Sequence, residues 1–186
     1  MKILLVQPKS TGFMGQVSKS GKASLARVTL TTIAALTPPQ HEVVIHDARL
    51  GDPDFDGNWD LVGFTGMTCE IPHVYQMANA FRKRGKTVAI GGYHATALPE
   101  EAAKHADIVV VGEAEGLWPQ ILFELEQGGT QHTFYQNEAL IDMRDMVIPR
   151  RELLNRDMYT VFNTIQATRG CPFNCEVSIN LPDDPK

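Results

Sequence analysis

The sequence has no apolar run that approaches the ~20 residues needed to cross a bilayer, and no signal-peptide pattern follows Met1 and Lys2. Basic residues are scattered apart from Arg82, Lys83 and Arg84, and the net charge is −5, so nucleic-acid binding has little support. There are only three cysteines, two of them close together, which favours metal or redox chemistry in a reducing compartment over a disulfide framework. These absences predict a cytoplasmic protein that binds neither nucleic acid nor membrane.

Common signatures of phosphate, flavin and receiver sites are also missing. No GxGxxG follows the first apolar run in the right register and no Walker sequence is present, so a dinucleotide or a nucleoside triphosphate is not favoured. A receiver domain would need clustered acidic residues after its first strand, where this chain has Gln7, Pro8 and Lys9. A flavin site would ordinarily show aromatic residues that sandwich the ring, and the candidates are Phe13 and Tyr93.

What the sequence does contain is an alternation of short apolar runs and helical patterns. Apolar runs typical of buried strands occupy residues 2–8, 42–48, 60–66, 87–92 and 107–113. Helical spacing of apolar residues occupies 24–36, 71–84 and 116–127, a short helix is expected at Pro99, and every gap can be helical. The pattern predicts an α/β fold, a flavodoxin-like, doubly wound, parallel five-stranded sheet with order 2-1-3-4-5. Residues 132–137 are a candidate edge strand.

Small residues gather where the predicted strands end, which is where open parallel sheets bind ligands. The loop after the first strand, residues 8–24, is 17 residues long against the usual 2–6. Any single loop of this kind is more readily explained as a turn, but four at one edge favour a ligand that approaches the backbone closely. The candidate ligand-binding residues are Ser10, Thr11, Gly12, Gly15, Thr65, Gly66, Met67, Thr68, Gly91, Gly92, Tyr93, His94, Gly112, Glu113 and Gly116.

The strand ends "VGFTGMT" and "TVAIGGYHAT" resemble the Ser-x-Leu and Gly-Gly elements of Rossmann-like cobalamin (vitamin B12) binding domains, with Thr65-Gly66-Met67 in place of Ser-x-Leu. The resemblance implies that the chain binds cobalamin. Family members that supply a lower cobalt ligand carry Asp-x-His-x-x-Gly in the first loop. Here Gly12 stands at the histidine position, which implies base-off, His-off cobalamin.

The segment "IQATRGCPFNCE" looks like the opening of a radical S-adenosylmethionine (radical SAM) barrel, whose Cys-x3-Cys-x2-Cys loop holds a [4Fe-4S] cluster. Cys171 and Cys175 match two ligands, and Ser178 stands where the third is expected, so the cluster motif is incomplete. The resemblance implies a cobalamin-binding domain over residues 1–136, a connector over 137–159, and the truncated start of a radical SAM barrel over 160–186. In full-length relatives the cluster and S-adenosylmethionine serve methyl transfer, and we expect this chain to be truncated and catalytically incompetent.

Several alternatives stay open at this point. The fold also suits a flavodoxin-like binding or signalling module without cobalamin, or an inert folded fragment. His94 can reach a cofactor edge or pack within its loop, and Glu113 and Glu115 can bind cofactor amides or cap the next helix. Asp47 and Arg49 read as a simple ion pair. We expect residues after about Tyr159 to be poorly anchored, unless they add to an existing sheet edge or pair with a sheet across a homodimer.

Overall fold

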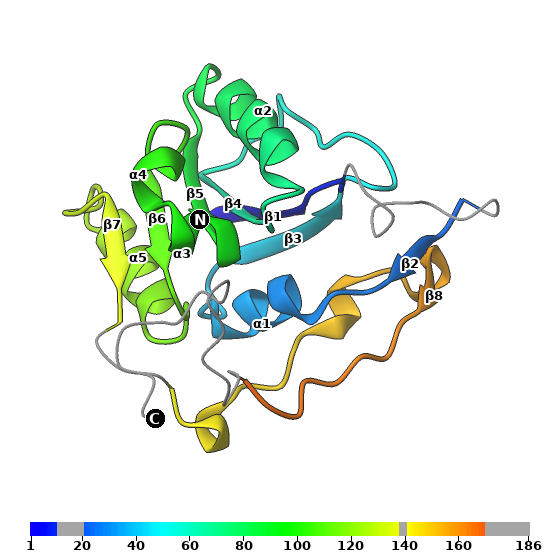
Figure 1. Cartoon of the computed structure of the whole chain (residues 1–186). Helices are drawn as coiled ribbons and strands as arrows, with labels where there is room; N and C mark the ends of the chain where they lie inside the picture. The colour runs from blue at the N-terminus through cyan, green and yellow to red at the C-terminus, as the bar shows by residue number, and fades with distance from the viewer. Residues whose placement is uncertain (11–20, 138–140, 170–186) are drawn as a thin grey trace.

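The first strand of the protein is apolar on both of its faces. In β1 (Lys2–Gln7), Leu4 and Val6 enter one hydrophobic core while Ile3 and Leu5 enter the other. This two-sided burial is what a parallel sheet covered by helices requires. The computed structural model describes residues 1–10, 21–137 and 141–169, and Figure 1 shows helices on both sides of the sheet that contains β1.

The main sheet has six parallel strands in the order β3-β1-β4-β5-β6-β7. The strands that join β1 are β3 (Glu42–Asp47), β4 (Leu61–Thr65), β5 (Thr87–Gly91), β6 (Ile108–Val111) and β7 (Phe134–Gln136). The five strands predicted from the sequence are all present, in the predicted order 2-1-3-4-5. The sixth, β7, is the candidate edge strand, and it pairs with β6.

Helices divide between the two faces. Buried residues of α1 (Val28–Leu36) and α5 (Leu117–Glu126) share a core with Ile3 and Leu5, and Trp118 Nε1 donates to Thr37 Oγ1 at 2.8 Å to tie the two helices together. The opposite face is covered by α2 (Ile71–Arg82), α3 (Tyr93–Ala97) and α4 (Pro99–Ala102). No helix in the described part of the chain is long and apolar enough to cross a membrane.

Two local predictions are wrong. The helix expected over residues 24–36 starts only at Val28, because Ala23–Leu25 forms a short strand, β2. The gap between β3 and β4 contains turns and bends instead of a helix, so this crossover passes over β1 without one. Proline at position 53 and the glycines at 51 and 57 fit that outcome, since both residue types interrupt helices.

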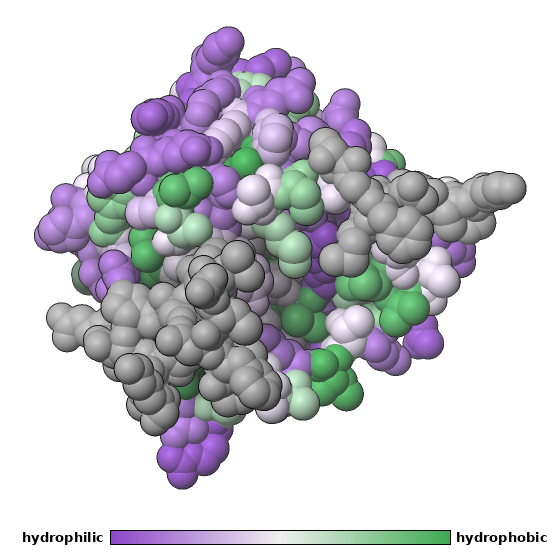
Figure 2. Space-filling view, viewed as in Figure 1, coloured by the Kyte–Doolittle hydropathy of each residue, from purple (hydrophilic) through white to green (hydrophobic). Residues whose placement is uncertain are grey.

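The segment after β7 returns to the sheet through three single turns, η2 (Met143–Asp145), η3 (Arg151–Leu153) and η4 (Arg156–Met158). It then forms β8 (Tyr159–Val161), which pairs in parallel with β2 of the same chain. The expectation that residues after about Tyr159 are poorly anchored is therefore wrong as far as residue 169. Figure 2 shows hydrophobic residues, in green, gathered around the place of β2 and β8, while the surface over α2 is hydrophilic.

Candidate functional site

The carboxyl ends of β1 and β4 form the switch point of the sheet, because β3 lies on one side of β1 and the later strands lie on the other. The loops after β4, β5 and β6 meet at this edge and are joined by hydrogen bonds. Thr96 Oγ1 donates to the Gly92 carbonyl at 3.0 Å and accepts from the Gly112 amide at 2.9 Å. The His94 amide also donates to the Gly66 carbonyl at 3.3 Å, so the three predicted strand-end loops form one connected surface.

Gly92 sits where the ends of β4 and β5 approach most closely. Its φ is 94° and its ψ is −175°, a conformation that is essentially restricted to glycine. A Cβ at this position would lie 2.6 Å from Thr65 Oγ1 and 3.0 Å from the Gly66 amide nitrogen. By contrast, a Cβ on Gly91 would meet Val110 Cβ at 3.4 Å, which is ordinary contact. Of the Gly-Gly pair, Gly92 is thus the position at which the backbone requires glycine.

His94 is buried, with 4% of its surface exposed. Its Nδ1 lies 3.2 Å from Thr68 Oγ1, and its Nε2 lies 3.2 Å from Glu101 Oε1. The hydrogen bond from His94, followed by one from Tyr75, lowers the pKa of the Glu101 carboxyl below its ordinary value. Both ring nitrogens of His94 thus have partners within the fold. This agrees with the alternative in which His94 packs within its loop instead of reaching a cofactor.

Met67 and Tyr93 present apolar surface at the same edge. Met67 is 37% exposed and Tyr93 is 68% exposed, although each lies only two residues after the end of a largely buried strand. Met67 is held in place because its amide donates to Glu70 Oε2 at 3.0 Å and its carbonyl accepts from the Glu70 amide at 2.9 Å. Exposed apolar side chains on fixed loops of this kind suit contact with a flat ligand.

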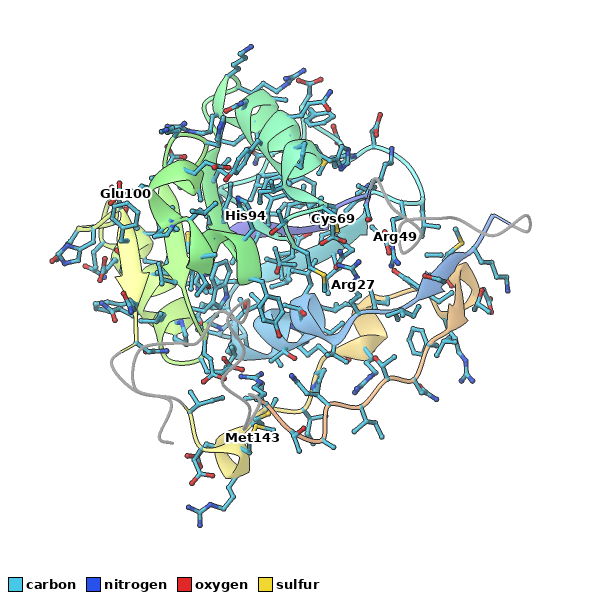
Figure 3. The ribbon with its side chains drawn as sticks, in the orientation of Figure 1. Arg27, Arg49, Cys69, His94, Glu100 and Met143 are labelled. Atoms are coloured by element: carbon cyan, nitrogen blue, oxygen red, sulfur yellow. The ribbon has the colours of Figure 1, made fainter. Side chains whose placement is uncertain are left out.

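An ion pair spans the edge between the two helical layers. Arg27 directly precedes α1 and Glu70 directly precedes α2, and Arg27 Nη2 lies 2.5 Å from Glu70 Oε1. Figure 3 shows Arg27, Arg49 and Cys69 gathered near the place where β1 and β3 end. Because Glu70 is fully buried, this pair fixes how the two helix starts sit across the switch point.

A second buried ion pair holds the β2–β8 sheet to the end of β3. Arg49 Nη2 lies 2.6 Å from Asp47 Oδ2 and also donates to the Leu25 carbonyl of β2, while the Tyr159 hydroxyl of β8 donates to Asp47 Oδ2 at 3.1 Å. Burial disfavours the charge of Arg49, but the hydrogen bond and attraction of Asp47 outweigh it and raise the pKa of the guanidinium. Burial, with the charge of Asp47, raises the pKa of the Tyr159 hydroxyl.

Gln7 ends β1 at the switch point and carries a buried amide. The residue is 4% exposed, and neither Nε2 nor Oε1 has a hydrogen-bond partner among the described residues. By strand alternation its side chain lies on the face of Ile3 and Leu5, toward α1. A buried amide without partners costs about 1–3 kcal/mol, so this position fits a polar ligand group.

Glu113 and Glu115, in the loop after β6, hold the later part of the chain. Arg169 Nη1 lies 3.1 Å from Glu113 Oε1, and Arg169 Nη2 lies 2.6 Å from Glu115 Oε1. Burial opposes the charge of Arg169, but Glu115 and then Glu113 outweigh it and raise its pKa. The loop is further fixed by Asn137 Nδ2, which donates to the carbonyls of both glutamates at 2.8 and 2.9 Å.

The structure brings most of the predicted residues together at one edge of the sheet. These are Thr65, Gly66, Met67, Thr68, Gly91, Gly92, Tyr93, His94, Gly112, Glu113 and Gly116. Ser10 follows the end of β1, and its hydroxyl lies 3.6 Å from Cys69 Sγ. Thr11, Gly12, Gly15, Cys171 and Cys175 lie outside the described residues.

Sequence reasoning missed Gln7, Arg27, Glu70 and Arg169 as members of the site, while the predicted Asp47–Arg49 pair is confirmed. The missed partners come from distant segments, and their contacts depend on the tertiary fold. Within the described ranges, no group of three or more His, Cys, Asp or Glu side chains could hold a metal ion. A shallow hollow of about 570 Å³ lies at the opposite, amino-terminal edge of β5, lined by Arg82, Lys86 and Asp107 among others, and takes no part in this site.

The B12 binding domain family matches residues 24–122, just over half of the chain. The matched region extends from β2 into α5 and includes the loops after β4, β5 and β6. Gln7 and Arg169 lie outside it.

Curated relatives of the chain are methyltransferases. It is 36% identical over 166 residues to bacteriochlorophyllide d C-8(2)-methyltransferase of Chlorobaculum tepidum, covering 86% of this chain and 37% of the relative. It is 33% identical over 181 residues to bacteriochlorophyllide d C-12(1)-methyltransferase of the same organism, covering 94% of this chain and 39% of the relative. An uncharacterized methyltransferase of Synechocystis sp. is 31% identical over 159 residues, covering 83% of this chain and 29% of the relative.

The chain therefore spans well under half the length of these curated relatives. Its sheet order, its strand-end glycines and the matched region agree with one another. The chain belongs to the B12 binding domain family.

Proposed function

We propose that the chain binds cobalamin across the carboxyl edge of its sheet, as the cofactor-binding part of a methyltransferase. The observation that carries the proposal is the tight junction of β4 and β5 at Gly92, within the region that the B12 binding domain family matches. When bound, cobalamin supplies a cobalt centre able to accept and pass on a methyl group. The protein's part is binding and orientation.

The residues at the edge fit such a cofactor in size and polarity. Gly92 lets the ends of β4 and β5 meet closely with no side chain between them, and Met67 and Tyr93 offer exposed apolar surface to a flat ring. The unpartnered amide of Gln7 offers the N–H donors of Nε2 and the acceptor oxygen Oε1 to amide or hydroxyl groups of the cofactor. His94 takes no part in cobalt ligation on this proposal, because both of its ring nitrogens already have partners.

The proposed state is base-off and His-off. Its support is the sequence, which has Gly12 where the ligand histidine of related domains would stand. The wider proposal is that residues 1–136 are the cobalamin domain, 137–159 the connector and 160–186 the start of a radical SAM domain. Serine at position 178 leaves Cys171 and Cys175 with an incomplete ligand set for a [4Fe-4S] cluster, so this chain would not cleave S-adenosylmethionine.

The test is an absorption spectrum of the chain after incubation with hydroxocobalamin and desalting. We expect nearly equimolar retention, and an EPR spectrum of the reduced cofactor without superhyperfine splitting from an axial nitrogen. Absence of retention would refute the proposal and support a flavodoxin-like module without cobalamin. Nitrogen splitting would refute the His-off state alone. Iron analysis after anaerobic reconstitution should give less than one cluster per chain.

A further inference from the structure

A hydroxyl, an imidazole and a carboxylate lie in a row at the carboxyl edge of the sheet. Thr68 Oγ1 lies 3.2 Å from His94 Nδ1, and His94 Nε2 lies 3.2 Å from Glu101 Oε1. Thr68 is exposed in the loop after β4, whereas His94 is buried and Glu101 belongs to α4. The imidazole therefore joins an exposed hydroxyl at the edge to a carboxylate in the helical layer behind it.

The backbone and the ring of His94 are both held in place. Its amide donates to the Gly66 carbonyl at 3.3 Å, and its carbonyl accepts from the Leu98 amide at 2.9 Å. Tyr75 of α2 packs edge-on against the ring, with centroids 6.2 Å apart and an interplanar angle of 73°. A flip of the ring would put carbons in place of the nitrogens and leave buried polar atoms without partners, which folded proteins avoid. The imidazole thus has one preferred orientation.

The carboxylate decides which ring nitrogen carries the proton. The hydrogen bond from His94 keeps the pKa of the Glu101 carboxyl below its ordinary value, so this group is ionised at neutral pH and can only accept. His94 Nε2 must therefore donate to it. In a neutral imidazole the other nitrogen is then an acceptor, so Nδ1 takes the hydrogen of the Thr68 hydroxyl. The Thr68 oxygen is left with lone pairs alone to offer to a ligand.

We propose that Thr68 selects a hydrogen-bond donor on the ligand, a primary amide N–H, and that His94 and Glu101 are positioning residues that fix the polarity of its hydroxyl. The choice of ligand group rests on the proposed function, because cobalamin carries primary amides around the rim of its corrin ring. A carboxylate in place of that amide would face an oxygen that has no hydrogen left to donate. The polarity itself does not depend on the cofactor, since its contacts are all within the chain.

The polarity is tested without cofactor, by nitrogen NMR of isotopically labelled histidine. At about pH 8, above the range in which free histidine titrates, we expect a neutral His94 with its proton on Nε2. Glu101→Gln should give a mixture of the two neutral tautomers, because a neutral amide can donate or accept. Glu100→Gln is the matched control, since it removes the same charge from an exposed residue of α4 that Figure 3 shows well away from His94. A proton on Nδ1 in the parent chain, or an unchanged tautomer in Glu101→Gln, would overturn the inference.

The choice of ligand group is tested with hydroxocobalamin and with its monocarboxylic acids, in each of which one rim amide has become a carboxylate. The parent chain should bind hydroxocobalamin more tightly than at least one of these acids. Thr68→Val, which keeps the shape and removes the hydroxyl, should weaken hydroxocobalamin binding about two- to tenfold, the range for one neutral hydrogen bond. It should also remove the preference for the amide over that acid, and Thr68→Ser should restore the preference.

The two proposals fail in different ways. If the parent chain retains no hydroxocobalamin, the proposed function is refuted, while the tautomer of His94 still decides the polarity of Thr68. If the parent chain retains hydroxocobalamin but binds every acid equally well, or if Thr68→Val keeps the preference of the parent, the inference about Thr68 is overturned and the proposed function stands. Equal urea unfolding of Thr68→Val and Thr68→Ser would show that a difference in binding is not a loss of fold.

Discussion

At the scale of single residues, Gly92 combines two constraints that usually occur apart. Its positive φ excludes most side chains, and its missing Cβ leaves space that Thr65 and Gly66 occupy. Gly85 has a positive φ of 72° but nothing within 4 Å of the Cβ position, and it precedes β5 at the opposite edge of the sheet. Comparing substitutions at the two glycines therefore separates the cost of backbone strain from the cost of steric contact.

Gly92→Ala should lower the free energy of unfolding by more than the about 1–3 kcal/mol that backbone strain alone costs, and reduce cobalamin retention, because a clash with β4 adds to the strain. Gly85→Ala should cost about 1–2 kcal/mol, from backbone conformation alone, and leave retention unchanged. Urea unfolding and the desalting assay measure the two quantities. Equal retention by the two variants would remove Gly92 from the cofactor edge.

The residue scale also shows where sequence reasoning succeeds and where it stops. Gly92 could be recognised because small residues at strand ends have a local meaning. Arg169 could not be paired with Glu113 and Glu115, because 54 positions separate Arg169 from Glu115 and no local pattern links them. In the sequence, Gln7 indicates only that no acidic residue ends the first strand, because the lack of partners for its amide is a property of the folded core.

At the scale of elements, β2 and β8 depend on each other and on the end of β3. Each has three residues, too few for a strand to be recognised from the sequence or to be stable alone. Asp47 and Arg49 supply the missing support by binding Tyr159 of β8 and the Leu25 carbonyl of β2. The five long strands were predictable because burial on both faces leaves continuous apolar runs, whereas this pair is created by tertiary contacts.

Tyr159→Phe should loosen this two-stranded sheet without unfolding the main one. The change removes the hydroxyl that donates to Asp47, at a cost of about 1.5 kcal/mol, the lower end for bonds to charged groups, because Arg49 still pairs with Asp47. Hydrogen exchange of the Ala26 amide, which donates to the Val161 carbonyl, should then accelerate roughly tenfold. Tyr93→Phe, at an exposed tyrosine, is the control, and equal exchange in both variants would contradict the role given to Tyr159.

At the scale of the whole molecule, one buried and two half-buried histidines make folding sensitive to acid. Burial lowers the pKa of His41, His73 and His105 below the ordinary 6.5. His41 shows the cause most clearly, since its Nδ1 lies 3.1 Å from the amino-terminal ammonium, whose charge also disfavours a protonated ring, and Glu126 offsets this only in part. The folded protein therefore binds fewer protons than the unfolded chain just below pH 6.5.

We expect the free energy of unfolding to fall as the pH is lowered from about 7.5 to about 5.5, because the unfolded chain takes up protons that the folded histidines resist. A histidine that stays neutral contributes at most about 1.4 kcal/mol per pH unit. Glu101 and Glu124, whose pKa values are lowered from 4.5, lose their contribution only at more acidic pH and do not obscure this window. Urea unfolding of the parent chain and of His41→Gln measures the effect. The variant should show a shallower dependence on pH, and a parent stability that stays level or rises toward pH 5.5 would contradict the protonation argument.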